Sequence, residues 1–339
     1  MKKVSLLLAL ALLLTLTACR KKEPETPAPP TPPEPVEEEP LRMEELTVEF
    51  PRNGLSTQQL ADAVKTLPNL LKTYFDETGL AEVERVTVTV GSSPAATAQA
   101  LKEGNIDLAF LPAEVFAEEG SETALLADAR LLDDGSLRAG TRALICAAPT
   151  EYGGQLSGRA SSGKPLSRNE LGRARWGVLD SASLGGYGCF DLWLADNYQG
   201  DRVSGLASVT VYGSYDDLFR AAANGEIDAL TIRDDARTDA AEVWTLDNTR
   251  TGAGGVRGYG RTESIWDELP VLDVTETLYT TVAAVRPELA ENGFAPALER
   301  VLQRMSEEQP ELMVVLGAQC FAPVTDAELN PTRRLAALG

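Results

Sequence analysis

Three apolar segments in the middle of the sequence each end in a polar run whose residue types suit the binding of a small ligand. The segments and the runs that follow them are 176–179 with 180–187, 209–211 with 213–215, and 227–232 with 233–235. The runs consist of small, hydroxyl-bearing or charged residues. Because an open parallel α/β sheet binds its ligand beyond the carboxyl ends of its strands, we expect the three runs to meet at one sheet edge.

The second of these units has a counterpart earlier in the chain. Residues 88–107 and 209–228 share the pattern Val-Thr-Val, two residues, Ser, then Ala seven positions on, Gly four further, and Ile-Asp. Each copy predicts a strand, a tight turn, a helix capped by Ser93 or Ser214 and ended by Gly, and a new strand. Either a shared ancestral unit or two ordinary βαβ units under the same capping rules would give this pattern.

Two helix N-termini with capping serines would present free backbone N–H groups and the positive ends of helix dipoles, which favour an anion. Micromolar binding requires about 8 kcal/mol, and three or four charge-assisted hydrogen bonds of roughly 1.5–3 kcal/mol each would supply it. The donors are the backbone of 183–186 and the hydroxyls of Ser92, Ser93, Ser214 and Tyr215. Arg233 and Arg257 could add charge, although a solvated side chain is the simpler interpretation of each.

The first forty residues predict export and anchoring. Lys2 and Lys3 precede an apolar run at 4–14, and Leu-Thr-Ala-Cys then ends at Cys19. This is the layout of a signal peptide, and its Leu-Thr-Ala-Cys end resembles a bacterial lipobox, in which the cysteine carries lipid. The Pro- and Glu-rich segment that follows cannot form a core and predicts an extended spacer. We therefore expect a protein outside the cytoplasm, anchored to the cell membrane through Cys19.

Composition excludes several functions. The 339 residues are 43% hydrophobic and 24% charged, as in ordinary globular proteins, and the net charge of −20 argues against nucleic acid as a partner. Histidine is absent, which removes Ser-His and Cys-His catalysis and the commonest metal ligand. Cys146, Cys189 and Cys320 allow at most one disulfide, of undetermined pairing, and their spacing suggests no metal. No cofactor is expected.

Other segments predict the framework. Strands are expected at 46–50, 83–90, 141–148 and 278–285, the last two as partners. Apolar residues between 57 and 74 predict either two short helices or one kinked at Pro68. Three further interpretations are a loop at 151–164, a strand at 243–246 and a glycine-rich surface loop at 252–260, whose flanks do not suit a phosphate-binding loop.

Taken together, residues 44–328 resemble the PhnD-type substrate-binding proteins of phosphate, phosphite and phosphonate ABC transporters. The matching segments are Ala100-Leu101, Gly104 and 106–110, then 180–187 against a pattern D-P-x-S-x-S-G, Gly213-Ser214-Tyr215 against G-S-H, and 225–228 followed by Asp235. The resemblance implies a two-lobed type II periplasmic-binding-protein fold, with a hinge of two crossing strands and one ligand held between the lobes.

The resemblance also implies roles for individual residues. Ser183 and the two positions after it would meet phosphonate oxygens, Tyr215 stands where the family has an anion-binding His, and Asp235 stands where a carboxylate meets an amino or hydroxyl group. The chain departs from the family pattern in having Gly185 for a second Ser, Tyr for His, Pro94 for an aromatic residue, and no clear acidic match near 276. The candidate ligand-binding residues are Ser93, Ser183, Leu184, Gly185, Gly186, Tyr187, Ser214, Tyr215 and Asp235.

The predicted fold is α/β with two lobes, each a mostly parallel sheet flanked by helices. The predicted parts are a signal peptide at 1–19, a disordered linker at 20–44, lobe I at 45–148 plus 275–339, and lobe II at 149–274. The expected protein is a monomeric, lipid-anchored binding protein that closes on a phosphonate-, phosphite- or phosphate-type anion and delivers it to ABC permease subunits. The alternatives are a sulfonate or thiamine-precursor ligand, a sensor without a permease, or an enzyme using Asp180, Asp234 or Asp235.

Overall fold

The structure is a computed structural model that describes residues 40–339 except 53, 120–122 and 133–134. The predicted signal peptide, the lipidation site Cys19 and most of the predicted linker lie outside the described residues. Among the residues that are described, no helix combines the length and the apolar character that a membrane crossing requires.

The first sheet is built from segments near both ends of the described chain. Its strands are β1 (Leu41–Pro51), β2 (Ala81–Gly91), β3 (Leu108–Pro112), β4 (Thr123–Leu131), β5 (Leu137–Ala139), β11 (Thr281–Val285) and β12 (Cys320–Pro323). Their order is β12-β4-β11-β3-β1-β2, with β5 paired to β4. Val48 on β1 lies opposite both Val88 and Leu108, so β1, β2 and β3 are parallel, whereas β11 and β4 run antiparallel to their neighbours.

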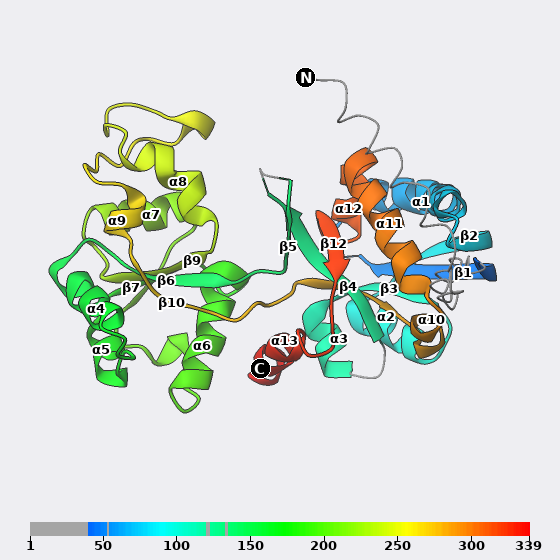
Figure 1. The fold of residues 1–339 in the computed structure, drawn as a ribbon, viewed down its shortest axis with the longest axis horizontal. Coiled ribbons are helices and arrows are strands. Elements are labelled where there is room, and N and C mark those ends of the chain that lie inside the picture. The colour runs from blue at the N-terminus through cyan, green and yellow to red at the C-terminus, as the bar shows by residue number, and fades with distance from the viewer. Residues whose placement is uncertain (1–39, 53, 120–122, 133–134) are drawn as a thin grey trace, which may run out of the picture. The chain divides into compact units, whose positions relative to one another are not determined.

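Helices cover both faces of this sheet (Figure 1). They are α1 (Thr57–Thr78), α2 (Pro94–Lys102), α3 (Ala113–Glu119), α10 (Pro287–Glu291), α11 (Phe294–Glu308), α12 (Pro310–Val315) and α13 (Asn330–Ala337). On one face α1, α11 and α12 close a core that includes Phe50 and in which the rings of Phe75 and Phe294 stack, with their centres 5.4 Å apart. On the other face α2 and α3 bury Leu101 and Phe116.

The second sheet is formed by the middle of the chain. Its strands are β6 (Ala143–Ala147), β7 (Trp176–Val178), β8 (Val209–Val211), β9 (Ala229–Arg233) and β10 (Val271–Val274). They lie in the order β10-β6-β9-β7-β8. Trp176 pairs in parallel with both Val209 and Ala229, so β7, β8 and β9 end at the same edge. This is the arrangement that the polar runs after the three apolar segments predicted.

The helical segments of the second sheet again form two layers (Figure 1). They are α4 (Glu151–Ser161), α5 (Arg168–Arg173), the π-helical turn η1 (Leu184–Gly188), α6 (Cys189–Asn197), η2 (Val203–Gly205), α7 (Tyr215–Ala223), α8 (Ala236–Trp244), η3 (Ala253–Gly255) and α9 (Ile265–Glu268). Phe219 and Trp244 pack edge to face between α7 and α8. On the opposite face Trp176 packs on Phe190 of α6 at 4.6 Å. The two sheets with flanking helices confirm the predicted two-lobed α/β class. The sheets are mixed, however, and not mostly parallel as predicted, because β4, β5, β6, β10, β11 and β12 pair antiparallel with their neighbours.

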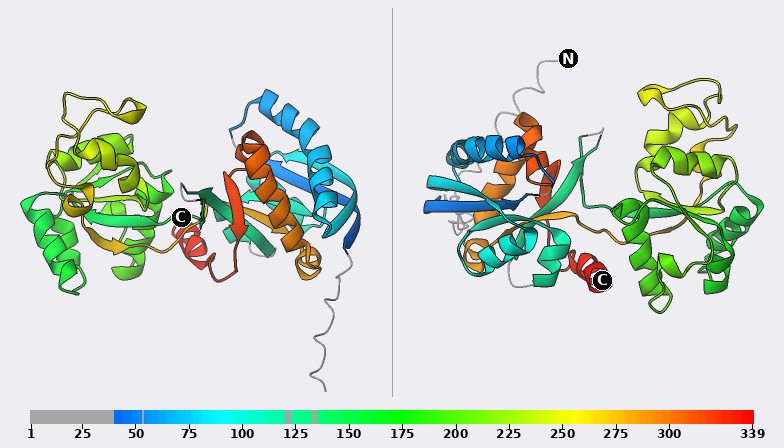
Figure 2. Two further views of the ribbon diagram at one scale, coloured as in Figure 1. Left: turned by 45° about the horizontal axis from the view of Figure 1, so that its top comes forward. Right: turned by 180° about the vertical axis from the view of Figure 1, so that it is seen from behind.

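The chain passes between the sheets after β5 and again after β10 (Figures 1 and 2). There Thr141 and Leu278 exchange both backbone hydrogen bonds, at 2.7 and 2.8 Å. Gly140 has φ +62°, and a Cβ at this position would lie 2.6 Å from the carbonyl oxygen of Leu278, so only glycine suits the crossing. Since β6 belongs to the second sheet, the crossing precedes Ala143, whereas the predicted boundary followed residue 148.

The two βαβ units have the local structure that their shared pattern predicted. The hydroxyls of Ser93 and Ser214 each accept a hydrogen bond from the backbone N–H three residues on, and so cap α2 and α7. Each helix ends before a left-handed glycine, Gly104 at φ +73° and Gly225 at φ +71°. The strands β3 and β9 then begin directly after the Ile-Asp pairs.

Several predicted elements differ from those observed. The Gly- and Ser-rich segment at 151–164 forms α4, because the Thr150 hydroxyl caps its first turn and Leu156 is buried. The expected strand at 243–246 is the end of α8. Of the two alternatives left open at Pro68, the structure has the single helix, α1. The strand β11 pairs with β3 and β4 rather than with 143–147. The helical state of α8 and the strand partners of β11 depend on which side chains become buried against distant parts of the chain. Neither can therefore be predicted from the local sequence.

Candidate functional site

The candidate site starts at the carboxyl ends of β7, β8 and β9, where the chain leads into η1, α7 and α8. After β7, Ser183 caps η1 by accepting a hydrogen bond from Gly186 N at 3.1 Å, and its own N–H bonds to the Asp180 carbonyl. The N–H groups of Leu184 and Gly185 have no acceptor within the part of the chain that the structure describes. They are therefore the free donors that a helix start offers to an anion.

The two glycines of this turn allow it to pack closely on the sheet. A Cβ on Gly186 would lie 2.6 Å from Leu179, and one on Gly185 would lie 3.1 Å from both Arg233 and Thr141. Gly185 stands where the resembling family has a second Ser. The absence of a side chain at Gly185 lets the backbone of η1 pack directly against Arg233 at the end of β9.

Tyr215, the first residue of α7, links the three strand ends. Its hydroxyl accepts a hydrogen bond from Arg233 N at 3.0 Å, and the Arg233 guanidinium lies 5.9 Å from the ring centre. Burial raises the pKa of Tyr215, while the Arg233 N–H and the Ser183 hydroxyl act in the opposite direction. The phenol therefore stays protonated at neutral pH, with the Ser183 hydroxyl beside it as a side-chain hydrogen-bond partner.

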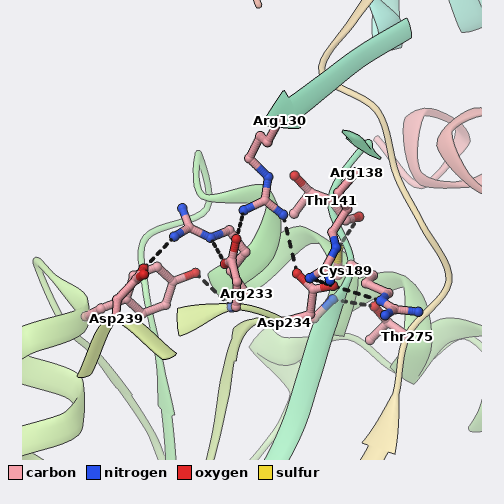
Figure 3. Close-up of polar contacts among 12 residues, drawn as sticks. Arg130, Arg138, Thr141, Cys189, Arg233, Asp234, Asp239 and Thr275 are labelled. Atoms are coloured by element: carbon pink, nitrogen blue, oxygen red, sulfur yellow. Dashed lines mark hydrogen bonds and ion pairs between the residues drawn. The ribbon is translucent and has the colours of Figure 1, made fainter. Parts of the chain in front are cut away.

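An ion-pair cluster, called here the β9 cluster, lies beyond the end of β9 (Figure 3). Its members are Arg130, Arg138, Arg142, Arg233, Asp234, Asp235 and Asp239. With four guanidinium groups and three carboxylates it carries one net positive charge. The sign of this local charge is opposite to that of the whole chain.

Asp234 is the most enclosed acid of the β9 cluster, with 3% of its side chain exposed. It accepts hydrogen bonds from Arg138 at 2.8 Å, Arg142 at 2.9 Å and Arg130 at 3.3 Å. Arg130 comes from β4 of the first sheet and Asp234 follows β9 of the second, so this ion pair joins the two lobes. A carboxylate with so little solvent requires such partners.

Asp235 pairs with Arg130 and with Arg233, and 20% of its side chain is exposed. Arg233 also bonds to Asp239 at 2.9 Å. Burial lowers the pKa of the Arg233 guanidinium and the Asp235 carboxylate raises it, with a net rise. Arg233 is thus a permanent cation at the point where β9 ends.

Two polar residues of the first lobe, Asp128 and Ser93, have hydrogen-bond partners only within that lobe among the described residues. Asp128 on β4 accepts hydrogen bonds from the backbone N–H groups of Thr280 and Thr281, at 2.7 and 3.1 Å, and burial raises the pKa of this carboxyl. Ser93 is exposed at the start of α2, where it bonds to Ala96 N. No hydrogen bond or ion pair connects Ser93 with the second sheet among the described residues.

A cavity of about 560 Å³ opens between the two lobes. The first sheet contributes Pro112 and Thr280, and the second contributes Ala182, Leu184 and Tyr187. The C-terminal helix α13 forms part of its wall and packs against both α3 and α6. A second cavity of about 400 Å³ is lined by Asp235 and other residues of the β9 cluster, together with Leu131 of β4.

The structure brings four of the predicted ligand-binding residues together: Ser183, Gly185, Tyr215 and Asp235 meet around Arg233. Leu184 and Tyr187 line the 560 Å³ cavity instead, and Gly186 is buried against Leu179. Ser214 is occupied by the cap of α7, since its hydroxyl accepts from Asp217 N and donates to the Asp217 carboxylate. Ser93 stands apart on the first sheet. Which of these residues bind a ligand stays a prediction.

Sequence reasoning missed the arginines that come from the first lobe and the crossing: Arg130, Arg138 and Arg142. Their partners lie about a hundred positions later in the chain, and no motif marks them. The only available signal was that three arginines fall within 130–142 of an otherwise acidic chain.

Catalytic chemistry by the thiols has no support in this geometry. Cys146, Cys189 and Cys320 are buried and free, and burial raises the pKa of Cys146 and of Cys189 to about 12. A thiol with such a pKa is not a nucleophile at neutral pH. Within the described residues there is also no group of three or more acidic or cysteine side chains placed to hold a metal ion.

The fold and its strand-end site define a two-lobed solute-binding protein, and a family comparison specifies the kind. Residues 54–329 match the family described as "ABC transporter, phosphonate, periplasmic substrate-binding protein". The chain belongs to this family. Its members are transporter components that bind small ligands outside the cytoplasm and work with permease subunits, and they are not enzymes.

Comparison with curated proteins gave no match. Among solved structures, XAC2383 from Xanthomonas citri bound to ATP is similar at 15% identity and TM-score 0.44, over 87% of this chain and 96% of that one. PhnD1 from Prochlorococcus marinus in complex with methylphosphonate is similar at 11% identity and TM-score 0.36, over 87% and 97%. The alkanesulfonate-binding protein SsuA from Xanthomonas axonopodis pv. citri bound to MOPS has 14% identity and TM-score 0.29, over 86% and 83%. The ligands named for these structures are ligands of those proteins and do not identify the ligand of this chain.

Proposed function

We propose that this protein captures a small oxyanion of the phosphonate, phosphite or phosphate type between its two lobes and delivers it to an ABC permease. The observation that supports the proposal is a gathering of hydrogen-bond donors with net positive charge at one sheet edge. The donors are the N–H groups of Leu184 and Gly185, the Tyr215 hydroxyl, and the guanidinium groups of Arg130 and Arg233.

The strength of these donors suits a transport protein. Micromolar affinity corresponds to about 8 kcal/mol, and hydrogen bonds to a charged group contribute roughly 1.5–3 kcal/mol each. Three or four of the donors at this edge reach that value. Tyr215 stands in for the family's His, and as a protonated phenol it adds a donor without adding charge; Arg233 and Arg130 supply the charge instead.

Capture proceeds by closure. A ligand favours the closed form by as much as its affinity for that form exceeds its affinity for the open one. The crossing segments at Gly140 and Leu278 connect the lobes and serve as the hinge, while Arg130 brings a first-lobe cation to second-lobe ligands. An anion that bonds both to η1 and to Arg130 therefore draws the lobes together.

Delivery takes place at the membrane. The lipobox-like sequence ending at Cys19 anchors the chain through lipid, and the Pro-rich spacer lets the folded part reach a permease. The protein acts as a monomer and leaves its ligand chemically unchanged.

Isothermal titration of the detergent-solubilised full chain tests the proposal. The panel is phosphate, phosphite, methylphosphonate, ethylphosphonate, aminomethylphosphonate, methanesulfonate and a thiamine-precursor pyrimidine. We expect at least one phosphorus oxyanion to bind with a Kd in the micromolar range or below, and phosphorus NMR to recover it unchanged. Binding of only the sulfonate or only the pyrimidine would establish the alternative ligand class, and a new phosphorus signal would indicate an enzyme.

A further inference from the structure

The carboxylates beyond β9 are already neutralised by the protein's own cations. Asp234 is held by three arginines and Asp235 by two, with 3% and 20% of their side chains exposed. A ligand that carried an ammonium group beside its anionic group would find both of these carboxylates already paired.

Such a ligand would have to displace a guanidinium. Arg130 is only 20% exposed and bonds to Asp235 through Nη1 and to Asp234 through Nη2. Its planar fork serves both acids at once, which an ammonium group of a small ligand cannot reproduce. Removing one partner of an enclosed pair leaves the other charge uncompensated, and this is the costly outcome. The site therefore resists a cationic ligand group at Asp235.

An anion can be added without breaking any of these pairs. A guanidinium has five N–H donors, and Arg233 uses Nε for Asp235 and Nη2 for Asp239, so Nη1 remains. The Nε of Arg130 is buried and has no acceptor among the described residues. The net positive charge of the β9 cluster adds to these free donors. The cluster thus accepts negative charge and excludes further positive charge.

We infer that the site selects oxyanions without a cationic group, with Arg130 as a built-in counterion in the place that a ligand amine would otherwise take. This inference rests on the proposed function and specifies its substrate class: alkylphosphonates or inorganic phosphorus oxyanions, and not aminoalkylphosphonates. In this arrangement Asp235 positions Arg130 and Arg233 and does not contact the ligand's substituent.

Ethylphosphonate and aminomethylphosphonate provide the test, because they have the same number of heavy atoms and differ in a methyl against an ammonium group. With the wild-type full chain we expect ethylphosphonate to bind at least tenfold more tightly. In Arg130→Gln, Asp235 keeps Arg233 on Oδ1 but its Oδ2 is released and accepts the ammonium, so this preference shrinks by about tenfold or reverses. Arg138→Gln is the matched control, since Arg138 pairs with Asp234 alone, and it keeps the wild-type preference. The double variant Arg130→Gln with Asp235→Asn restores the preference.

The outcomes separate the inference from the proposed function. If aminomethylphosphonate binds the wild-type chain as tightly as ethylphosphonate, or if Arg130→Gln leaves the ratio unchanged, the inference is wrong and the proposed function stands. If no phosphorus oxyanion of the panel binds, the proposed function itself is wrong. Circular dichroism verifies that Arg130→Gln is folded, and should it not fold, the wild-type ratio decides the matter.

Discussion

Replacing Tyr215 by Phe removes one oxygen atom from the point where the three strand ends meet. The phenol accepts a hydrogen bond from Arg233 N at 3.0 Å, and its own O–H is the donor that we propose for the ligand. The ring itself, which packs 6.3 Å from Phe219, remains in Tyr215→Phe. The substitution therefore tests the hydroxyl and little else.

The expected magnitude follows from the two hydrogen bonds. A bond from the phenol to a charged ligand contributes about 1.5–3 kcal/mol, and a factor of ten in Kd corresponds to about 1.4 kcal/mol. Affinity for the preferred oxyanion should thus fall roughly 10- to 150-fold. The Arg233 N–H also loses its acceptor, so we expect the free energy of unfolding to fall by about 1–2 kcal/mol.

Titration calorimetry measures the affinity and urea denaturation measures the stability. Tyr198→Phe is the matched control, because the Tyr198 hydroxyl donates to the Leu166 carbonyl at 2.8 Å, away from the strand ends. It should lose a similar amount of stability with no change in Kd. If Tyr215→Phe binds the oxyanion within twofold of the wild-type Kd, the hydroxyl is not a ligand donor and the reasoning about this edge is refuted.

Two further predictions concern the framework. Gly140→Ala introduces a Cβ at φ +62° that lies 2.6 Å from the carbonyl oxygen of Leu278. We expect chemical denaturation to show a loss of about 2 kcal/mol in the free energy of unfolding, against about 1 kcal/mol for the control Gly163→Ala, where φ is similar but the space is open. Equal losses would contradict the steric argument. Burial raises the pKa of Asp228, but hydrogen bonds from Arg175 outweigh it, so its pKa is lowered. A lowered carboxyl pKa stabilises the fold above the unfolded value near 4 and loses this effect as the pH falls. Asp228→Asn should therefore lower the free energy of unfolding by about 2 kcal/mol at pH 7, which is less than the loss of a fully buried ion pair because Arg175 is half-exposed. The loss should be clearly smaller at pH 3. An unchanged loss at pH 3 would exclude the ion pair as the cause.

The features that could be predicted from the sequence are those with local physical causes. The capping serines Ser93 and Ser214, the glycines that end their helices, and the strands that start after Ile-Asp depend on residues within a single turn. The polar runs after β7, β8 and β9 were expected to share an edge because parallel strands end together, and the register confirms this.

The features that could not be predicted depend on partners distant in the chain. Arg130 finds Asp234 and Asp235 only through the assembly of both sheets, and the strand that carries it was not expected at all. The apolar segment containing Val243 and Trp244 suits a strand as well as a helix, and contacts with α7 and α9 decide for the helix. In both cases the determining interaction lies outside any local window.

A crystal structure of the chain with its tightest-binding phosphorus oxyanion tests the central claim most directly. The account predicts one tetrahedral anion at the ends of β7, β8 and β9, within hydrogen-bond distance of Leu184 N, Gly185 N and the Tyr215 hydroxyl, with a guanidinium of Arg130 or Arg233 against its oxygens. An anion bound elsewhere, with these donors left free, would contradict it.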